Sequence, residues 1–115
     1  MNETAPALAA LKAQYHQLRR RLARLGYISH GSVQQRTVAT SGRTGRQWTR
    51  KVAQKTVSVA LSQEQYEAMK AAVANQRRLR KIIQEMESVS RRIIFASAAD
   101  TRRRKRLSKK VLGLN

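Results

Sequence analysis

The sequence predicts an α+β fold: a long, coiled-coil-like helical hairpin with a small antiparallel β-sheet between the helices and a basic C-terminal helical tail. Three observations predict it: a leucine heptad near the N-terminus, alternating runs rich in Val and Thr in the middle, and a second long apolar stripe after residue 62. Because the chain has 115 residues, we expect a single α+β domain over residues 1–98 and a tail over residues 99–115.

The first helix is predicted over residues 5–25. Thr4 can cap it, Pro6 suits a first turn, and Gly26 would end it in the left-handed conformation. Its apolar residues recur every three or four positions, which is the spacing of a coiled-coil seam. They are Leu8, Leu11, Tyr15, Leu18, Leu22 and Leu25.

Alternating polar and apolar residues then predict three strands. In the second strand Trp48, Arg50 and Val52 share one face, and a hairpin turn is expected at Ala53 and Gln54. This pair lacks the glycine or asparagine that tight primed turns prefer. The strands are predicted at about 32–39, 46–52 and 55–61.

The second helix is predicted over residues 63–97. Ser62 and Gln65 have the spacing of a capping box, in which each side chain satisfies the backbone N–H of the other residue. Leu107, Val111 and Leu114 indicate a further short helix in the tail. The apolar stripe of the second helix comprises Tyr66, Met69, Val73, Gln76, Leu79, Ile83, Met86, Ser90 and Ile93.

Charge is the strongest indication of function. Between Glu3 and Glu64 the sequence has no acidic residue but has eleven basic ones, and the whole chain carries a net charge of +19. Soluble proteins normally interleave both signs, because like charges repel in the compact state. A polyanion partner would supply the missing charge. The charge therefore predicts nucleic-acid binding.

Candidate nucleic-acid contacts fall into three groups: the first helix, the glycine-containing loop with its strands, and the tail. The helix arginines have no glutamate one turn away, glycines let a backbone approach a ligand closely, and a basic run forms an electrostatic arm. Trp48 is expected in the core rather than stacked on a base. The candidates are Arg19, Arg20 and Arg24; Arg36, Arg43, Arg46, Arg50, Lys51 and Lys55; and Arg102, Arg103, Arg104, Lys105 and Arg106.

Catalysis and metal binding have little support in the sequence. The chain contains no cysteine, and neither His16 nor His30 has an acidic neighbour at ligand spacing. No Gly-rich phosphate loop or nucleophile elbow is present. We therefore expect a non-enzymatic protein without metal or cofactor. With no apolar run of about 18 residues and no secretory signal pattern, we expect it to be cytoplasmic and nucleoid-associated, without membrane contact.

The chain resembles a family of small basic bacterial proteins that are often found beside transposase genes. The resemblance spans nearly the whole chain, and it implies a bacterial mobile element without implying an activity. Some relatives carry a cysteine cluster where this chain has Thr40-Ser41-Gly42-Arg43, so no metal site carries over. The motifs that carry the resemblance are Leu25-Gly26-Tyr27-Ile28-Ser29, Gly31-Ser32-Val33, Gln47-Trp48-Thr49-Arg50-Lys51-Val52, Lys55-Thr56-Val57-Ser58-Val59 and the stretch from Arg102-Arg103-Arg104 to Val111-Leu112-Gly113.

Together these features predict an accessory protein of a mobile element that binds double-stranded DNA. One alternative is an RNA-binding protein associated with a ribosome or a guide RNA, because both interactions rest on phosphate contacts. Another is a coiled-coil adaptor for a transposase or recombinase. The apolar cluster Ile93, Ile94 and Phe95 needs the strands, the tail or a second copy of the chain to cover it, so a second copy is a further candidate partner.

Overall fold

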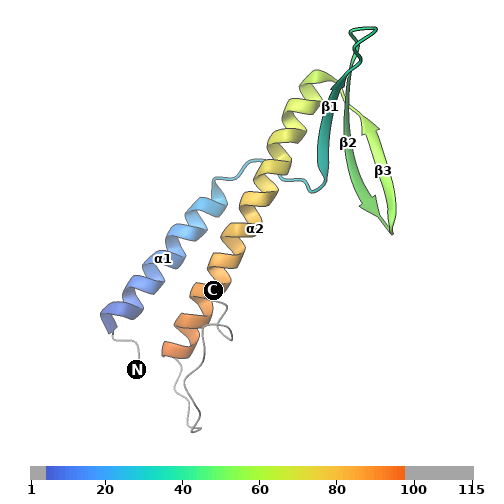
Figure 1. Ribbon diagram of the computed structural model, residues 1–115. Helices are drawn as coiled ribbons and strands as arrows, with labels where there is room; N and C mark the ends of the chain where they lie inside the picture. Colours follow the sequence, from blue (N-terminus) through green and yellow to red (C-terminus); the bar gives the residue numbers. More distant parts are fainter. Residues whose placement is uncertain (1–4, 98–115) are drawn as a thin grey trace. The chain divides into compact units, whose positions relative to one another are not determined.

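The computed structural model describes residues 5–97, and the candidate residues and expected helix of the tail lie outside them. It confirms the α+β fold, with two helices packed together and a three-stranded antiparallel sheet between them in the chain (Figure 1). The elements are α1 (Ala5–Ala23), β1 (Ser32–Thr37), β2 (Thr44–Val52), β3 (Lys55–Ala60) and α2 (Gln63–Ser97).

Two compact units make up the described residues. The helical unit contains residues 5–24 and 80–97, and the sheet unit is Leu25–Leu79. The long helix α2 contributes its first half to the sheet unit and its second half to the helical unit. The expectation of a single domain over residues 1–98 stays a prediction.

A heptad seam holds the helical unit together. Leu11 and Leu18 of α1 are buried, as are Ile82 and Val89 of α2, and each pair is seven residues apart. The predicted stripe of α2 omitted the buried Ile82 and Val89 and included Ile83, which is 42% exposed. Ile82 and Ile83 are adjacent and equally apolar, so only the packing of α1 decides which of them is buried.

The three strands pair in the order β1-β2-β3, with both pairs antiparallel. Thr37 pairs with Thr44, so β1 ends earlier and β2 begins earlier than the sequence predicts. The turn between them is closed by two backbone bonds of 2.8 Å, from Val38 N to Arg43 O and from Gly42 N to Val38 O. Gly42 has a φ of 69°, which glycine adopts without steric cost.

The turn between β2 and β3 falls at Ala53 and Gln54, as predicted. Val52 pairs with Lys55, and the φ angles of the two turn residues are 49° and 68°. Two successive positive φ angles define a primed turn, whose twist matches the flanking strands. Neither residue is a glycine or an asparagine, so the backbone is strained at both positions.

Both helix termini next to the sheet have identifiable causes. At the start of α2, Gln65 N donates to Ser62 Oγ at 3.1 Å and Ser62 N donates to Gln65 Oε1 at 2.9 Å, which is the predicted capping box. At the end of α1, Gly26 does not have the predicted left-handed φ, and the helix stops at Ala23. Gly26 instead lies against Asn75, whose Nδ2 would be 3.4 Å from a Cβ at that position.

Replacing Ala53 by Asn and Gln54 by Gly should stabilise the protein by about 1–2 kcal/mol, because these residues adopt positive φ at lower cost. Thermal unfolding followed by circular dichroism should show a rise in Tm of several degrees. Ala53→Pro is the opposite control, since proline fixes φ at a negative value and should lower Tm. An unchanged Tm for the Asn-Gly variant would contradict the strained turn.

Leu18→Asp should destabilise the helical unit by several kcal/mol, because it places a carboxylate at a position that is only 3% exposed. Circular dichroism should show loss of helix at 25 °C or a much lower Tm. Gln17→Asp introduces the same charge at the neighbouring exposed position and should leave Tm nearly unchanged. Equal melting of the two variants would show that this seam does not hold the unit together.

Candidate nucleic-acid interface

The pairing register divides the side chains of the sheet between two faces. Because successive side chains alternate, paired residues share a face. We call the face that carries Gln34 and Gln47 the glutamine face. The opposite face, which carries Trp48 and Val59, is the tryptophan face. The glutamine face comprises Ser32, Gln34, Arg36, Gly45, Gln47, Thr49, Lys51, Thr56, Ser58 and Ala60. The tryptophan face comprises Val33, Gln35, Thr37, Thr44, Arg46, Trp48, Arg50, Val52, Lys55, Val57 and Val59.

None of the residues in the three strands is buried. Even the valines of β3 on the tryptophan face are exposed, Val57 to 39% and Val59 to 44%. An antiparallel sheet usually packs one face on a core and leaves the other in water. Here no strand residue is buried, so both faces are accessible to solvent. The strands are held together by backbone hydrogen bonds and cross-strand side-chain pairs.

The candidate cations of the sheet lie on different faces. Arg36 and Lys51 belong to the glutamine face, and Arg46, Arg50 and Lys55 belong to the tryptophan face. Arg43 lies in the turn between β1 and β2. Since the sequence between Glu3 and Glu64 has no carboxylate side chain, every charged side chain on either face is positive. The arrangement suits a polyanion that could approach from either side.

On the tryptophan face, two arginines already have partners inside the protein. The guanidinium of Arg50 lies 5.5 Å from the centroid of the Trp48 ring, within the range of a cation–π interaction. Arg46 Nε donates to Gln35 Oε1 at 3.1 Å. Trp48 is half-buried rather than a core residue, which corrects the sequence-based expectation. Its ring is fixed instead by a hydrogen bond of 3.1 Å from Nε1 to His30 O.

The linker that Trp48 contacts is itself bonded to α2. Asn75 Nδ2 donates to Tyr27 O at 3.0 Å, and Ser29 N donates to Ala72 O at 3.1 Å. Gly31 follows with a φ of 114° and with the Trp48 ring directly against it. Half-buried Val33 and Trp48 lie at this end of the sheet. The linker thus contacts the tryptophan face, and the glutamine face is the more open of the two.

Cross-strand polar pairs line the glutamine face. Gln47 Nε2 donates to Gln34 Oε1 at 3.3 Å, and the hydroxyls of Thr49 and Ser58 are 3.2 Å apart. Beside the glutamine pair is a shallow groove of about 370 Å³. Gly45 and Ala60 contribute almost no side chain to it, so a ligand could approach the backbone there. The groove is lined by Gln34, Arg36, Val38, Gly45, Arg46, Gln47 and Ala60.

The candidate arginines of α1 belong to the helical unit. Arg19, Arg20 and Arg24 are exposed, and no ion pair involves them within residues 5–97. Arg21 has a partner in α2, with its Nη1 3.6 Å from Glu85 Oε2. This pair is about half exposed and contributes little stability. The three candidate arginines therefore remain available for phosphate.

Several residues of interest are absent from the sequence-based candidates. Arg77 and Arg78 of α2 are exposed in the sheet unit, and Arg78 Nη1 donates to Asn75 Oδ1 at 3.2 Å. The basic run that starts at residue 77 could have identified these two arginines from the sequence. Gln34 and Gln47 carry no charge, and only the strand register brings them together.

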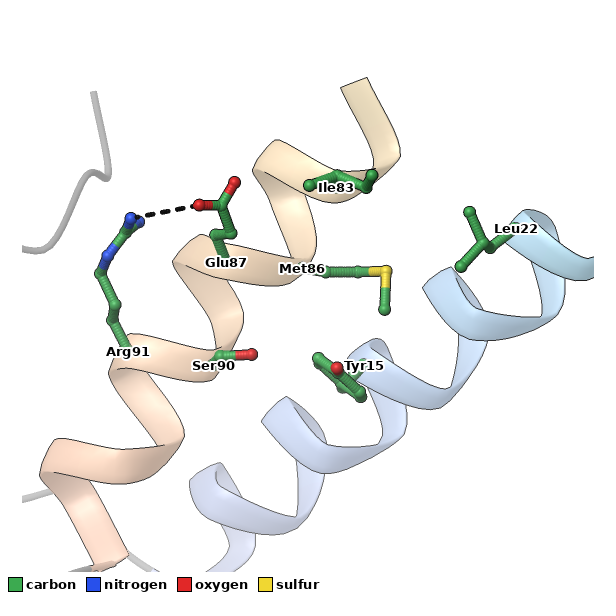
Figure 2. Close-up of a pocket in the computed structure, with 7 residues that line it drawn as sticks. All are labelled: Tyr15, Leu22, Ile83, Met86, Glu87, Ser90 and Arg91. Atoms are coloured by element: carbon green, nitrogen blue, oxygen red, sulfur yellow. Dashed lines mark ion pairs between the residues drawn. The ribbon is translucent and has the colours of Figure 1, made fainter. Parts of the chain in front are cut away.

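A second groove lies between the helices of the helical unit. It measures about 400 Å³, and in Figure 2 Tyr15 and Leu22 of α1 point toward Met86 of α2. Glu87 and Arg91 form an ion pair of 3.7 Å at its edge. Ile83 and Ser90 complete the lining. This groove is mostly apolar, so it suits a protein segment rather than nucleic acid.

Within residues 5–97, no helix is long and apolar enough to cross a membrane. Comparisons with protein-family models, curated proteins and solved structures gave no significant match. The resemblance to proteins encoded beside transposase genes thus stays a prediction, and the function has to be argued from the two faces of the sheet.

Gly31→Ala should displace Trp48, because a Cβ at Gly31 would lie 2.6 Å from Trp48 Nε1 and 2.7 Å from Thr49 O. Fluorescence of this single tryptophan should shift to longer wavelength as the ring becomes more exposed. Gly45→Ala is the matched control, since its Cβ would meet only Arg36 O at 4.0 Å. Identical spectra for both variants would contradict the proposed anchoring of the ring.

Proposed function

We propose that this protein is a non-enzymatic accessory factor that binds double-stranded DNA, and that the sheet is its main contact surface. The observation that carries the proposal is a sheet with two accessible faces, five cationic side chains in its strands and no acidic residue. A sheet without a core gains little from apolar burial, so selection for stability alone does not account for it. Contact with phosphates accounts for both the charge and the exposure.

The mode of contact follows from the geometry. Arginine presents a planar fork that pairs with phosphate oxygens, and lysine acts as a point charge. Arg36, Arg43 and Lys51 have no cation–π or carboxylate partner among the described residues. The exposed arginines of α1 add a second basic surface on the helical unit. The association with a mobile element rests on the sequence resemblance alone.

An adaptor function is the second candidate, and the groove of the helical unit supports it. Its lining of Tyr15, Leu22, Ile83 and Met86 suits an amphipathic helix of a transposase or recombinase. In that case the positive charge would hold the complex near DNA without a specific contact. Nucleic-acid binding by the purified chain separates the two functions, because an adaptor of this kind would bind duplex DNA only weakly.

Binding of the purified protein to a short DNA duplex should weaken steeply as salt increases. Displacement of counterions from about six phosphates predicts a slope near −5 in a plot of log affinity against log salt concentration. Fluorescence anisotropy over a series of salt concentrations measures it. Replacing the five cations of the strands by glutamine should flatten the slope by about 2 or more, since each phosphate contact contributes about 0.9 and at least two of the five contact phosphate. These cations are Arg36, Arg46, Arg50, Lys51 and Lys55.

Lys12→Gln and Lys70→Gln serve as controls for the loss of charge, because both lie on helices outside the candidate surfaces. They should leave the slope within about one unit of the wild-type value. No binding at low salt would exclude the proposed function. A slope that is steep in the wild type and unchanged in the strand variant would move the contact surface away from the sheet.

A further inference from the structure

Gly45 occupies a position where neither the backbone nor the packing requires glycine. Its φ lies outside the left-handed region, and the pairing of β1 with β2 continues past it without a bulge. A Cβ there would meet only Arg36 O, at 4.0 Å. Glycine inside a strand costs stability, and it often marks a place where a ligand approaches the backbone closely. Gly45 forms such an open place in the central strand.

Two amides stand beside this opening. The bond from Gln47 Nε2 to Gln34 Oε1 leaves Gln34 Nε2 and Gln47 Oε1 without another partner among the described residues. The pair therefore keeps a hydrogen-bond donor on Gln34 and an acceptor on Gln47. In the major groove of DNA, adenine presents the complementary pattern, with N7 as acceptor and the N6 amino group as donor.

The rest of the glutamine face fits the same ligand. Arg36 and Lys51 lie toward its two ends, about 20 Å apart along the strands at 3.4 Å per residue. The third strand adds only the short side chains of Thr56, Ser58 and Ala60. Long amides and small residues occupy the centre, and cations flank them. Phosphate contacts at the ends would position the sheet while the centre contacts base edges.

We propose that the glutamine face enters the major groove of duplex DNA and reads an adenine-containing site through Gln34 and Gln47, with Gly45 admitting the base edges close to the backbone. The inference rests on the proposed function. A major groove about 12 Å wide admits a two-stranded β-ribbon, here β1 and β2 with Gln34 and Gln47, whereas the deep, narrow major groove of duplex RNA does not. The tryptophan face is less suited, because Arg46 and Arg50 have partners there and the linker contacts it.

Selection from a pool of random DNA duplexes provides the preferred target, and a scrambled duplex of the same composition provides the reference. Wild-type protein should enrich a site that contains adenine. Gly45→Thr and the double variant Gln34→Ala, Gln47→Ala should each reduce the preference for the selected duplex by about tenfold or more. Both should bind the scrambled duplex with wild-type affinity and salt slope, since neither changes the charge. Replacing the essential adenine by 7-deazaadenine should reduce wild-type binding similarly.

Matched controls address folding and the choice of face. Threonine favours strands more than glycine does, so Gly45→Thr should melt at or above the wild-type temperature. Val59→Thr changes a side chain of the tryptophan face, outside the proposed contact, and should keep the preference. Gln35→Ala removes the neighbouring glutamine on the opposite face and should also keep it. If Gly45→Thr unfolds, the glutamine variant still decides the question.

The failures of the two proposals are distinguishable. The inference would be overturned if binding depended on salt but showed no preferred site. It would also be overturned if the preference survived in both glutamine-face variants. Both outcomes would leave DNA binding intact. If only Gln35→Ala lost the preference, base recognition would belong to the tryptophan face, and the inference would be overturned. Tighter binding of duplex RNA than of duplex DNA would exclude the major-groove mode. Failure of the wild type to bind any duplex would overturn the proposed function itself.

Discussion

The sheet unit depends on the linker between α1 and β1, because these few residues connect α2 with the end of the sheet. Asn75 holds the carbonyl of Tyr27, and Trp48 holds the carbonyl of His30. These two side-chain hydrogen bonds tie the linker to α2 and to the sheet. Gly31 provides the space for the Trp48 ring, since a Cβ there would lie 2.6 Å from Trp48 Nε1. A sheet with no buried residue of its own depends on an attachment of this kind.

Repulsion between the cations of the sheet destabilises the sheet unit. Clustered cations raise the free energy of the compact state, and nothing in the sequence of the sheet neutralises them. Polar pairs such as Thr37–Thr44 and Thr49–Ser58 offset part of the cost, but each contributes only about 1 kcal/mol or less. A ligand that binds only the folded state adds stability in proportion to the logarithm of its concentration. A polyanion would therefore both bind the sheet and stabilise it.

Local patterns predicted the helices and the position of the turn between β2 and β3, because each depends on neighbouring residues. The Ser62–Gln65 capping box fixes the start of α2, and the leucine heptad identifies the buried Leu11 and Leu18. Two features that could not be predicted from the sequence depend on packing between segments. The choice between Ile82 and Ile83 needs α1, and the pairing of Gln34 with Gln47 needs the register. Charge predicted which residues face solvent, but it did not predict that the arginines divide between two faces.

The strand order leaves β1 and β3 at the two edges of the sheet, where unpaired backbone groups can template pairing with another chain. Both edge strands have only six residues, and each carries a cation, Arg36 in β1 and Lys55 in β3. Short, charged edges oppose association between copies of the same protein. The strong salt used to strip nucleic acid from a basic protein screens this repulsion. Purification at high ionic strength is thus the condition in which edge-to-edge aggregation becomes most favourable, and light scattering at increasing salt would detect it.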